Sequence, residues 1–324
     1  MSAAQGANAA FSATMSKLPA LVTGGSGFVG RSVVKHLVAR GWPCVVLDIC
    51  PPADPDLNRF VADGSVQFHA VDLAEPGTVA QVVAGLEGKA WLVHLASKVE
   101  PSRLFSGLEE HFRIHINPVV NLMEEIGGRL AGVCFASSIE TYGTPQRQPL
   151  DETHPTVPFN LYGAGKLNAE HVFRISCDSL GVPLCILRLS HIYGPGEYYQ
   201  KAMPVFIKAC LDRGSVSLQG DGDDSRDFVH TTDVSRAIAL ALETGRSGIF
   251  NIAGGRTVSM RELLGLIQQL CNVSIDVVTV PRQRPKLEYA FDLAAARQGL
   301  GYVPTVDLAD GLRSEIRWIQ EQRR

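Results

Sequence analysis

The stretch that decides the fold is Leu21-Val-Thr-Gly-Gly-Ser-Gly-Phe-Val-Gly30, in which an apolar run meets three spaced glycines. Residues 19–23 predict a short strand, and residues 31–40 have the apolar spacing of a helix. Gly24 suits a tight turn, Gly27 lets backbone N–H groups approach a pyrophosphate, and Gly30 lets the helix pack closely on the strand. The stretch therefore predicts a dinucleotide site formed by Gly24, Gly27, Phe28, Val29 and Gly30.

An acidic residue ends the next predicted strand, Cys44–Asp48. Asp48 lies roughly 20 residues beyond the glycines, where a carboxylate accepts hydrogen bonds from a ribose. A carboxylate at this place repels the additional phosphate of NADP. We therefore expect NAD as the cofactor, held by Asp48 and its neighbour Ile49, and the alternative explanation of Asp48 is a turn residue before Pro51-Pro52.

Strand and helix patterns alternate after Asp48. Strands are predicted over residues 66–71, 90–95, 132–136 and 183–189, and helices over 78–86, over a long segment ending near Gly127, and over 162–180. This alternation predicts an α/β fold with a doubly wound parallel sheet of the Rossmann type. Several strands are nearly continuous apolar runs, as strands buried on both faces require.

The alternation loosens beyond about residue 193 into turns rich in Gly and Pro, separating short strands and helices. Strands are predicted over 216–218, 248–252 and 275–280, and helices over 205–211, 232–243, 260–270 and 308–320. We expect residues 1–17 to form a disordered tail, 18–190 an NAD-binding Rossmann domain that also carries the catalytic residues, and 191–324 mainly a substrate-binding lobe with some segments returning to the large domain.

Composition limits the classes of partner. The chain of 324 residues has a formal net charge of −3 and lacks a Lys/Arg cluster, which argues against nucleic acid or an anionic membrane and favours a small molecule. Its first 18 residues have the pattern of neither a secretion signal nor a membrane anchor. The 7 cysteines are scattered and never form a Cys-x-x-Cys pair, which predicts reduced core residues in a cytoplasmic protein.

Three side chains predict hydride chemistry. Tyr162 and Lys166 lie at i and i+4 on one helix face, and Ser138 follows a buried strand, so that it reaches the same sheet edge as the glycine turn. Removing the hydroxyl proton of an alcohol requires a base near neutral pH, whereas an ordinary phenol has a pKa of about 10. We expect Lys166 and the positively charged cofactor ring to lower the pKa of Tyr162, and Ser138 to orient the substrate oxygen.

From Leu18 onward the chain resembles the extended short-chain dehydrogenase/reductases, and within them the NAD-dependent epimerase/dehydratase group that modifies nucleotide sugars. The resemblance implies that Asp72 and Leu73 flank the adenine, that Leu95, Ala96 and Leu189 line the cofactor, and that Arg226 and Arg284 meet the nucleotide or diphosphate of the substrate. It also implies a homodimer formed by the helices after Pro101 and from Tyr162. The matching pieces are Thr23-Gly-Gly-Ser-Gly-Phe-Val-Gly30, Asp48, Val71-Asp72-Leu73, His94-Leu95-Ala96, Asn117, Ser137-Ser138, Tyr142-Gly143, Pro158, Tyr162, Lys166, Arg188, Tyr193-Gly-Pro-Gly196, Gly220-Asp-Gly222, Arg226-Asp-Phe-Val-His230 and Asp233.

The chain departs from the family pattern at the expected substrate side. His191 stands where many members have an Asn that contacts substrate, and Lys201 stands where some epimerases have an Asn next to the diphosphate. We therefore expect His191 and Lys201 in the substrate site. Lys286-Leu287 replaces a Gly-Asp pair after Arg284-Pro285, so the sequence does not predict which nucleotide the substrate carries.

Glu140 leaves the reaction open. Members that resemble 4,6-dehydratases or decarboxylases carry a Glu two residues before Tyr-Gly, but here Ile139 precedes it and supplies no acid. The leading hypothesis is an NAD-dependent nucleotide-sugar epimerase acting at C4, with Ser138, Tyr162 and Lys166 as catalytic residues. The alternatives are a dehydratase or decarboxylase that uses Glu140, a net dehydrogenase or ketoreductase, and a non-catalytic NAD-sensing scaffold. Glu140 is equally explained as an exposed loop acid.

No metal site is predicted. His111 and His115 have the spacing of a helical ligand pair, but Phe112 stands in place of the Glu of a zinc-protease motif, so that a solvated helix face is the preferred interpretation. Asp221, Asp223 and Asp224 lack the ligand spacing of a calcium loop.

Overall fold

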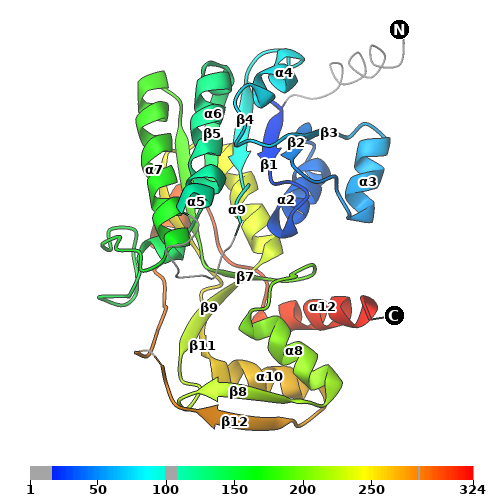
Figure 1. The fold of residues 1–324 in the computed structure, drawn as a ribbon, viewed down its shortest axis with the longest axis vertical. Coiled ribbons are helices and arrows are strands. Elements are labelled where there is room, and N and C mark those ends of the chain that lie inside the picture. Colours follow the sequence, from blue (N-terminus) through cyan, green and yellow to red (C-terminus); the bar gives the residue numbers. More distant parts are fainter. Residues whose placement is uncertain (1–16, 99–107, 284, 324) are drawn as a thin grey trace. The chain divides into compact units, whose positions relative to one another are not determined.

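The computed structural model describes residues 17–98, 108–283 and 285–323. Residues 1–16 of the predicted tail and Arg284 lie outside the described residues. The chain forms two compact units (Figure 1). The first comprises the described residues of 1–143, 156–188 and 235–250, and the second those of 144–155, 189–234 and 251–323.

The central sheet has seven strands in the order β10-β6-β5-β4-β1-β2-β3. The neighbouring pairs from β3 through β2, β1 and β4 to β5 are all parallel. The chain passes from β3 at one edge back across the sheet to β4, so the direction of winding reverses between β1 and β4 and the prediction of a doubly wound sheet is confirmed. The strands are β1 Ala20–Thr23, β2 Cys44–Asp48, β3 Val66–Ala70, β4 Ala90–His94, β5 Leu130–Ser138, β6 Leu184–Leu189 and β10 Gly248–Ile252.

Helices cover both faces of this sheet. On one face α2 and α9 are joined by the hydroxyls of Ser32 and Ser235, 2.9 Å apart, and by the ion pair of Arg40 with Glu243. On the other face α4, α6 and α7 enclose a core that includes Leu92, Phe135 and Phe173. The helices are α2 Phe28–Ala39, α3 Pro55–Ala62, α4 Thr78–Ala84, α5 Leu108–His115, α6 Asn117–Ile126, α7 Leu161–Leu180 and α9 Thr231–Thr244.

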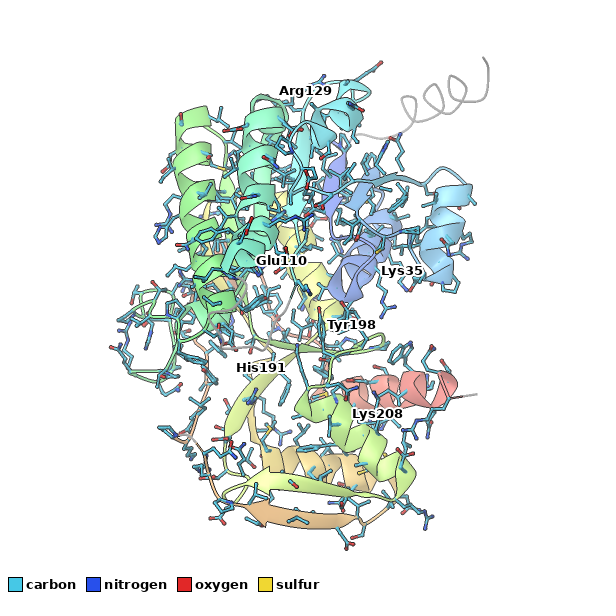
Figure 2. All side chains as sticks on the ribbon, in the orientation of Figure 1. Lys35, Glu110, Arg129, His191, Tyr198 and Lys208 are labelled. Carbon is cyan, nitrogen blue, oxygen red and sulfur yellow. The ribbon has the colours of Figure 1, made fainter. Side chains whose placement is uncertain are left out.

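Two helical segments differ from the sequence-based prediction. The long helix expected to end near Gly127 is divided into α5 and α6, because Pro118 stands in the first turn of α6 and cannot donate a backbone hydrogen bond. Helix α3 was not predicted. Its N-cap Asp54 accepts the N–H groups of Asp56 and Leu57, and Lys35 of α2 forms an ion pair with Asp54 at 3.0 Å (Figure 2).

The second unit contains a three-stranded sheet in the order β11-β9-β7 and a two-stranded sheet of β12 and β8. Strands β9 and β11 run antiparallel, whereas β7 runs parallel to β9. A separate core that includes Ile207, Leu263 and Leu312 joins the helices to these sheets. The elements are β7 His191–Tyr193, α8 Ala202–Asp212, β8 Ser215–Gln219, β9 Ser225–His230, β11 Thr257–Ser259, α10 Met260–Cys271, β12 Asp276–Val280, α11 Ala294–Leu300 and α12 Leu308–Glu321.

Among the described residues, no helix is both long enough and apolar enough to cross a membrane. The cysteines of the chain are free thiols, and five of them are buried, namely Cys44, Cys134, Cys177, Cys185 and Cys210.

Candidate active site

The glycine turn between β1 and α2 is held by close backbone contacts. Gly24 has φ +68°, and a Cβ there would lie 2.8 Å from the backbone of Ala96. A Cβ at Gly30 would lie 2.0 Å from the carbonyl oxygen of Gly24. Both positions therefore require glycine, and the turn can pass close under the first turn of α2 only without side chains.

The N-terminus of α2 has the properties of an anion site. Gly27 is its N-cap and supplies no side-chain cap, and no acidic residue stands in the first turn. The N–H groups at this end, including those of Phe28 and Val29, carry the positive end of the helix dipole. Together with the closely packed glycines, these groups fit the pyrophosphate of a dinucleotide.

Asp48 stands at the end of β2 beside this turn. Its Oδ2 accepts the Ser26 N–H at 3.0 Å and its Oδ1 accepts the Cys50 N–H at 3.2 Å. The neighbouring Ile49 is 68 % exposed, unusually so for an aliphatic side chain. The carboxylate is therefore fixed at the edge of the glycine turn, as a ribose acceptor requires.

The remaining predicted cofactor residues follow other strand ends. Thr23 Oγ1 accepts the N–H groups of Leu95 and Ala96, both at 3.2 Å, which fixes the chain after β4 against the glycine turn. Asp72 accepts the Ala74 N–H and forms an ion pair with Arg113 of α5.

Two of these residues are mainly packed into the protein. Leu73 is buried and its carbonyl accepts the side-chain amide of Asn121 at 2.9 Å. Leu189 is buried at the end of β6.

Ser138, Tyr162 and Lys166 converge in the first unit. Ser138 ends β5, and its side chain forms a hydrogen bond with the phenol of Tyr162. Lys166 is 4 % exposed, and its Nζ donates to the Ala136 carbonyl at 2.8 Å and lies 5.9 Å from the Tyr162 ring centroid. The three predicted catalytic side chains therefore share one site at the carboxyl end of β5.

Two glycines of the segment Tyr162-Gly-Ala-Gly-Lys166 permit this convergence. A Cβ at Gly163 would lie 2.4 Å from the carbonyl oxygen of Glu140, which belongs to the 3-10 turn η2, Ile139–Thr141. A Cβ at Gly165 would lie 2.7 Å from the imidazole of His111. Helix α7 therefore contacts η2 on one side and α5 on another with its backbone.

The protein's own groups raise the pKa of Tyr162 to about 12. Burial is the largest cause, the charge of Glu140 adds to it, and hydrogen bonds from Ser138 and Ser97 oppose it. Burial also lowers the pKa of Lys166 to about 7, against a smaller opposing effect of Glu170. In the chain itself desolvation outweighs the groups that lower the pKa of Tyr162, and Lys166 is not one of these groups. The expected lowering by Lys166 together with the cofactor ring stays a prediction.

Glu140 belongs to the same cluster. Its Oε2 accepts the amide of Asn160 at 2.9 Å, and Asn160 is also the N-cap of α7 through the Gly163 N–H. The preceding Ile139 is 4 % exposed and packs into the core. Glu140 is thus held next to Tyr162 by a specific contact, while its neighbour in the chain supplies no second acid.

A buried ionic network lies behind Ser138 and Lys166 and was not predicted from the sequence. Glu170 accepts Arg188 Nη2 at 2.7 Å and Nε at 3.1 Å, and Ser137 Oγ donates to the same carboxylate at 2.5 Å. Glu170 and Arg188 are 1 % and 3 % exposed. The i+4 spacing from Lys166 to Glu170 was the available signal, because it places both on one helix face.

The interpretation of His111 and His115 as a solvated helix face is wrong. His115 is 6 % exposed, its ring lies 5.7 Å from the Tyr162 ring, and its Nδ1 lies 3.4 Å from Ser97 Oγ. His111 is half-buried, and its imidazole centroid lies 4.7 Å from that of His115. No group of three metal-ligand side chains occurs among the described residues.

Three predicted substrate residues lie together in the second unit. His191 is on β7 (Figure 2), and its Nδ1 is buried without a hydrogen-bond partner among the described groups. Burial lowers the pKa of His191, and the charges of Arg226 on β9 and Lys201 before α8 lower it further. Lys201 also lies 3.6 Å from Glu197. The fourth residue, Arg284, lies outside the described residues.

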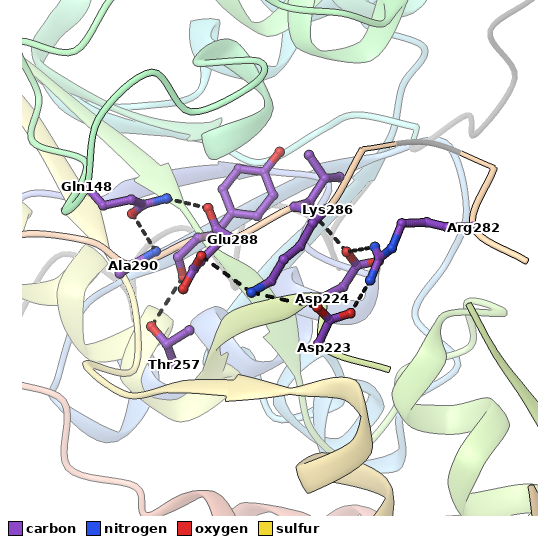
Figure 3. Close-up of polar contacts among 10 residues, drawn as sticks. Gln148, Asp223, Asp224, Thr257, Arg282, Lys286, Glu288 and Ala290 are labelled. Atoms are coloured by element: carbon purple, nitrogen blue, oxygen red, sulfur yellow. Dashed lines mark hydrogen bonds and ion pairs between the residues drawn. The ribbon is translucent and has the colours of Figure 1, made fainter. Parts of the chain in front are cut away.

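The chain on both sides of position 284 is tied to one acidic turn (Figure 3). Arg282 forms ion pairs with Asp223 and Asp224, the latter at 2.6 Å. Lys286 lies 3.8 Å from both Asp223 and Glu288. These aspartates, considered above as a calcium loop, therefore bind cationic side chains.

The fold and site define a dinucleotide-binding protein of the doubly wound class with a Ser, Tyr and Lys set at the carboxyl edge of its sheet. The model of the NAD dependent epimerase/dehydratase family matches residues 20–253. The chain belongs to this family. The predictions of the family, of an enzyme and of NAD as its cofactor are thereby confirmed.

Relatives with two different activities are similar to the chain. A dTDP-glucose 4,6-dehydratase of Streptomyces griseus is 30% identical over 315 residues, covering 94% of both chains. The solved structure of DesIV, a dTDP-glucose 4,6-dehydratase of Streptomyces venezuelae with NAD bound, has a TM-score of 0.84 and 30% identity, and 94% of this chain and 98% of that chain are covered. A UDP-glucose 4-epimerase of Thermotoga maritima, solved with UDP-glucose, has a TM-score of 0.84 and 25% identity, with 95% and 100% covered.

Proposed function

We propose that the protein is a nucleotide-sugar 4-epimerase. The observation that carries this proposal is the composition of the cluster around Tyr162, which contains a phenol, a hydroxyl and an ammonium, and in which Glu140 is the one carboxylate of the described residues whose charge acts on the phenol. That carboxylate, Glu140, is bound to Asn160, and the position before it is a buried isoleucine. An epimerase needs one base that removes and returns a hydroxyl proton, whereas a dehydratase also needs an acid for the leaving hydroxyl.

Bound NAD would supply a hydride acceptor and donor for the reacting sugar carbon. The glycine turn, the N-terminus of α2 and Asp48 would hold it, and Lys166 Nζ would bind its ribose. Tyr162 Oη removes the proton of the C4 hydroxyl, and Ser138 Oγ donates to the same oxygen as that oxygen becomes a carbonyl. The keto-sugar then presents its opposite face, and Tyr162 returns the proton to the C4 oxygen, which completes inversion.

The substrate class rests on the basic side chains of the second unit. Lys201 and Arg226 affect His191 electrostatically, so that two positive charges lie near one neutral imidazole. Positive charge with a hydrogen-bonding imidazole suits a diphosphate attached to a sugar. The relatives whose names mention UDP-glucose and dTDP-glucose support the same class.

A second candidate is dehydration through Glu140. Glu140 lies close enough to Tyr162 to raise the pKa of the phenol, and the chain is 30% identical to dTDP-glucose 4,6-dehydratases. In this reaction Glu140 would remove the C5 proton. Ile139 leaves no acid beside it, which is why epimerisation is preferred.

Incubation with UDP-glucose and with dTDP-glucose in D2O tests both candidates. An epimerase yields a product of unchanged mass that carries no deuterium at C5, whereas a dehydratase yields a keto-sugar that has lost one water and gained deuterium. Tyr162→Phe should lower the turnover by at least about a hundredfold, because it removes the acid–base group. Tyr198→Phe, on a phenol that is 61 % exposed, is the matched control. Net NADH accumulation would contradict the epimerase proposal.

A further inference from the structure

A buried imidazole lies beside the proposed catalytic phenol and has no part in the reaction just described. His115 is the last residue of α5, and its ring meets the Tyr162 ring edge to face at 75°. Ser97, which follows β4, forms hydrogen bonds with both groups, to the phenol of Tyr162 and to Nδ1 of His115. The three side chains therefore form one continuous hydrogen-bonded chain.

We propose that Ser97 and His115 carry the proton of the Tyr162 hydroxyl toward the protein surface through His111, and thereby set how fast the phenolate base forms. This inference rests on the proposed function, because it takes Tyr162 to be the base. Ser97 and His115 are positioning residues in this scheme, since they act on the substrate only through Tyr162.

The proton balance follows from the single hydrogen of the Ser97 hydroxyl. In the phenol state Tyr162 O–H donates to Ser97 Oγ, and Ser97 O–H donates to His115 Nδ1, while His115 keeps its proton on Nε2. In the phenolate state His115 Nδ1–H donates to Ser97 Oγ, and Ser97 O–H donates to the Tyr162 oxyanion. Two O–H bonds and the His115 Nε2–H bond break. One O–H bond forms at Ser97, one N–H bond forms at His115 Nδ1, and a third bond forms at a solvent hydroxide, which takes the Nε2 proton by way of His111 and becomes water.

The surroundings of His115 favour this tautomer exchange over an imidazolium. Burial lowers the pKa of His115 to about 3, and the nearby charges of Lys166 on α7 and His111 on α5 act in the same direction. The imidazole is therefore neutral at physiological pH, with one nitrogen that accepts and one that donates. The charge of Glu140 on η2 acts on Tyr162 itself and raises the pKa of the phenol.

The exit is provided by His111. Its ring is half-buried and lies 4.7 Å from the His115 ring, one helical turn earlier on the same face of α5. Gly165 makes this arrangement possible, because a side chain there would occupy the place of the His111 ring. Gly165 thus leaves room for the His111 ring beside His115, whose own ring contacts Tyr162.

The test is a stopped-flow pH jump on the NAD-bound protein without sugar, followed by tyrosinate absorbance and corrected with Tyr162→Phe. Ser97→Ala and His115→Phe should slow the ionisation of Tyr162 by at least about tenfold, because proton transfer by a positioned group contributes about a hundredfold or more. Added imidazole should restore the rate in His115→Ala, which a merely structural role does not explain. His171→Gln, which removes an exposed imidazole from α7, should leave the rate unchanged.

His115→Asn separates loss of proton transfer from misfolding. It keeps a polar group near the position of Nδ1, but an amide cannot exchange tautomers as an imidazole does. It should unfold at the wild-type temperature and still ionise Tyr162 slowly. Rates within about twofold of wild type in Ser97→Ala and His115→Phe would overturn the route while sugar turnover still reports on the proposed function. A pH jump without any signal from Tyr162 would instead overturn Tyr162 as the base.

Discussion

Replacing Glu170 by Gln tests the buried network behind Lys166, the proposed catalytic lysine. Glu170 holds Arg188 through two hydrogen bonds of 2.7 and 3.1 Å, and both side chains are almost fully buried. Glu170→Gln keeps the shape of the side chain but removes the negative charge, which leaves the guanidinium of Arg188 uncompensated in the interior. Breaking a buried pair in this way costs about 3–5 kcal/mol in the free energy of unfolding.

The same substitution acts on Lys166. Glu170 raises the pKa of Lys166 against the larger effect of burial, so the variant should have a lower Lys166 pKa than wild type, whose value is about 7. A lower pKa means that the ammonium is lost at a lower pH. The alkaline limb of the kcat/KM profile should therefore move to lower pH, while the stability loss is read from urea unfolding at neutral pH.

Two further variants isolate the cause. Glu124→Gln, at an exposed position of α6, should change neither measurement. Glu170→Gln combined with Arg188→Met removes both charges and should recover most of the stability, because the penalty lies in the unpaired charge. A loss below about 1 kcal/mol in Glu170→Gln together with an unchanged pH profile would refute the reasoning.

Three other predictions concern the cofactor and the oligomer. Gly30→Ala should weaken NAD binding at least about tenfold in calorimetry, because its Cβ would lie 2.0 Å from a backbone oxygen of the turn. Gly265→Ala on α10 is the control, since a Cβ there meets open space. It should leave NAD binding intact and stabilise the helix by about 0.5–1 kcal/mol. Asp48→Asn should reduce the preference for NAD over NADP by about tenfold or more, measured by the ratio of the two dissociation constants; an unchanged ratio would contradict its role. Ile175→Arg changes a side chain that is 72 % exposed and should dissociate the predicted homodimer in analytical ultracentrifugation. Val278→Arg is the control variant. A monomeric wild-type protein would disprove the predicted dimer.

The fold of the first unit could be predicted because its signals are local. The glycine turn, the apolar strands and the acid at Asp48 each occupy a few consecutive residues, and the chemistry of each follows from residue type alone. The division of α5 from α6 was also within reach, since Pro118 marks the boundary. It was missed because the apolar spacing continues across the break.

The errors in the site concern contacts between distant segments. His115 was assigned to a solvated face from its spacing with His111 alone, but its burial depends on packing against Gly165 of α7. The pKa of Tyr162 could not be predicted either. Its value depends on how much water the surrounding elements exclude, and no spacing of residues along one helix reports that quantity.

Gly163 sets how closely Glu140 approaches the helix that carries Tyr162. Because it lacks a side chain, the backbone of Glu140 comes within van der Waals range of the helix that carries Tyr162, and the carboxylate is brought next to the phenol. A methyl group at position 163 would push η2 away without altering any ionisable group. Under the proposed function, the size of residue 163 therefore sets how far Glu140 lies from Tyr162, which makes position 163 a place to change that distance without replacing a proposed catalytic group.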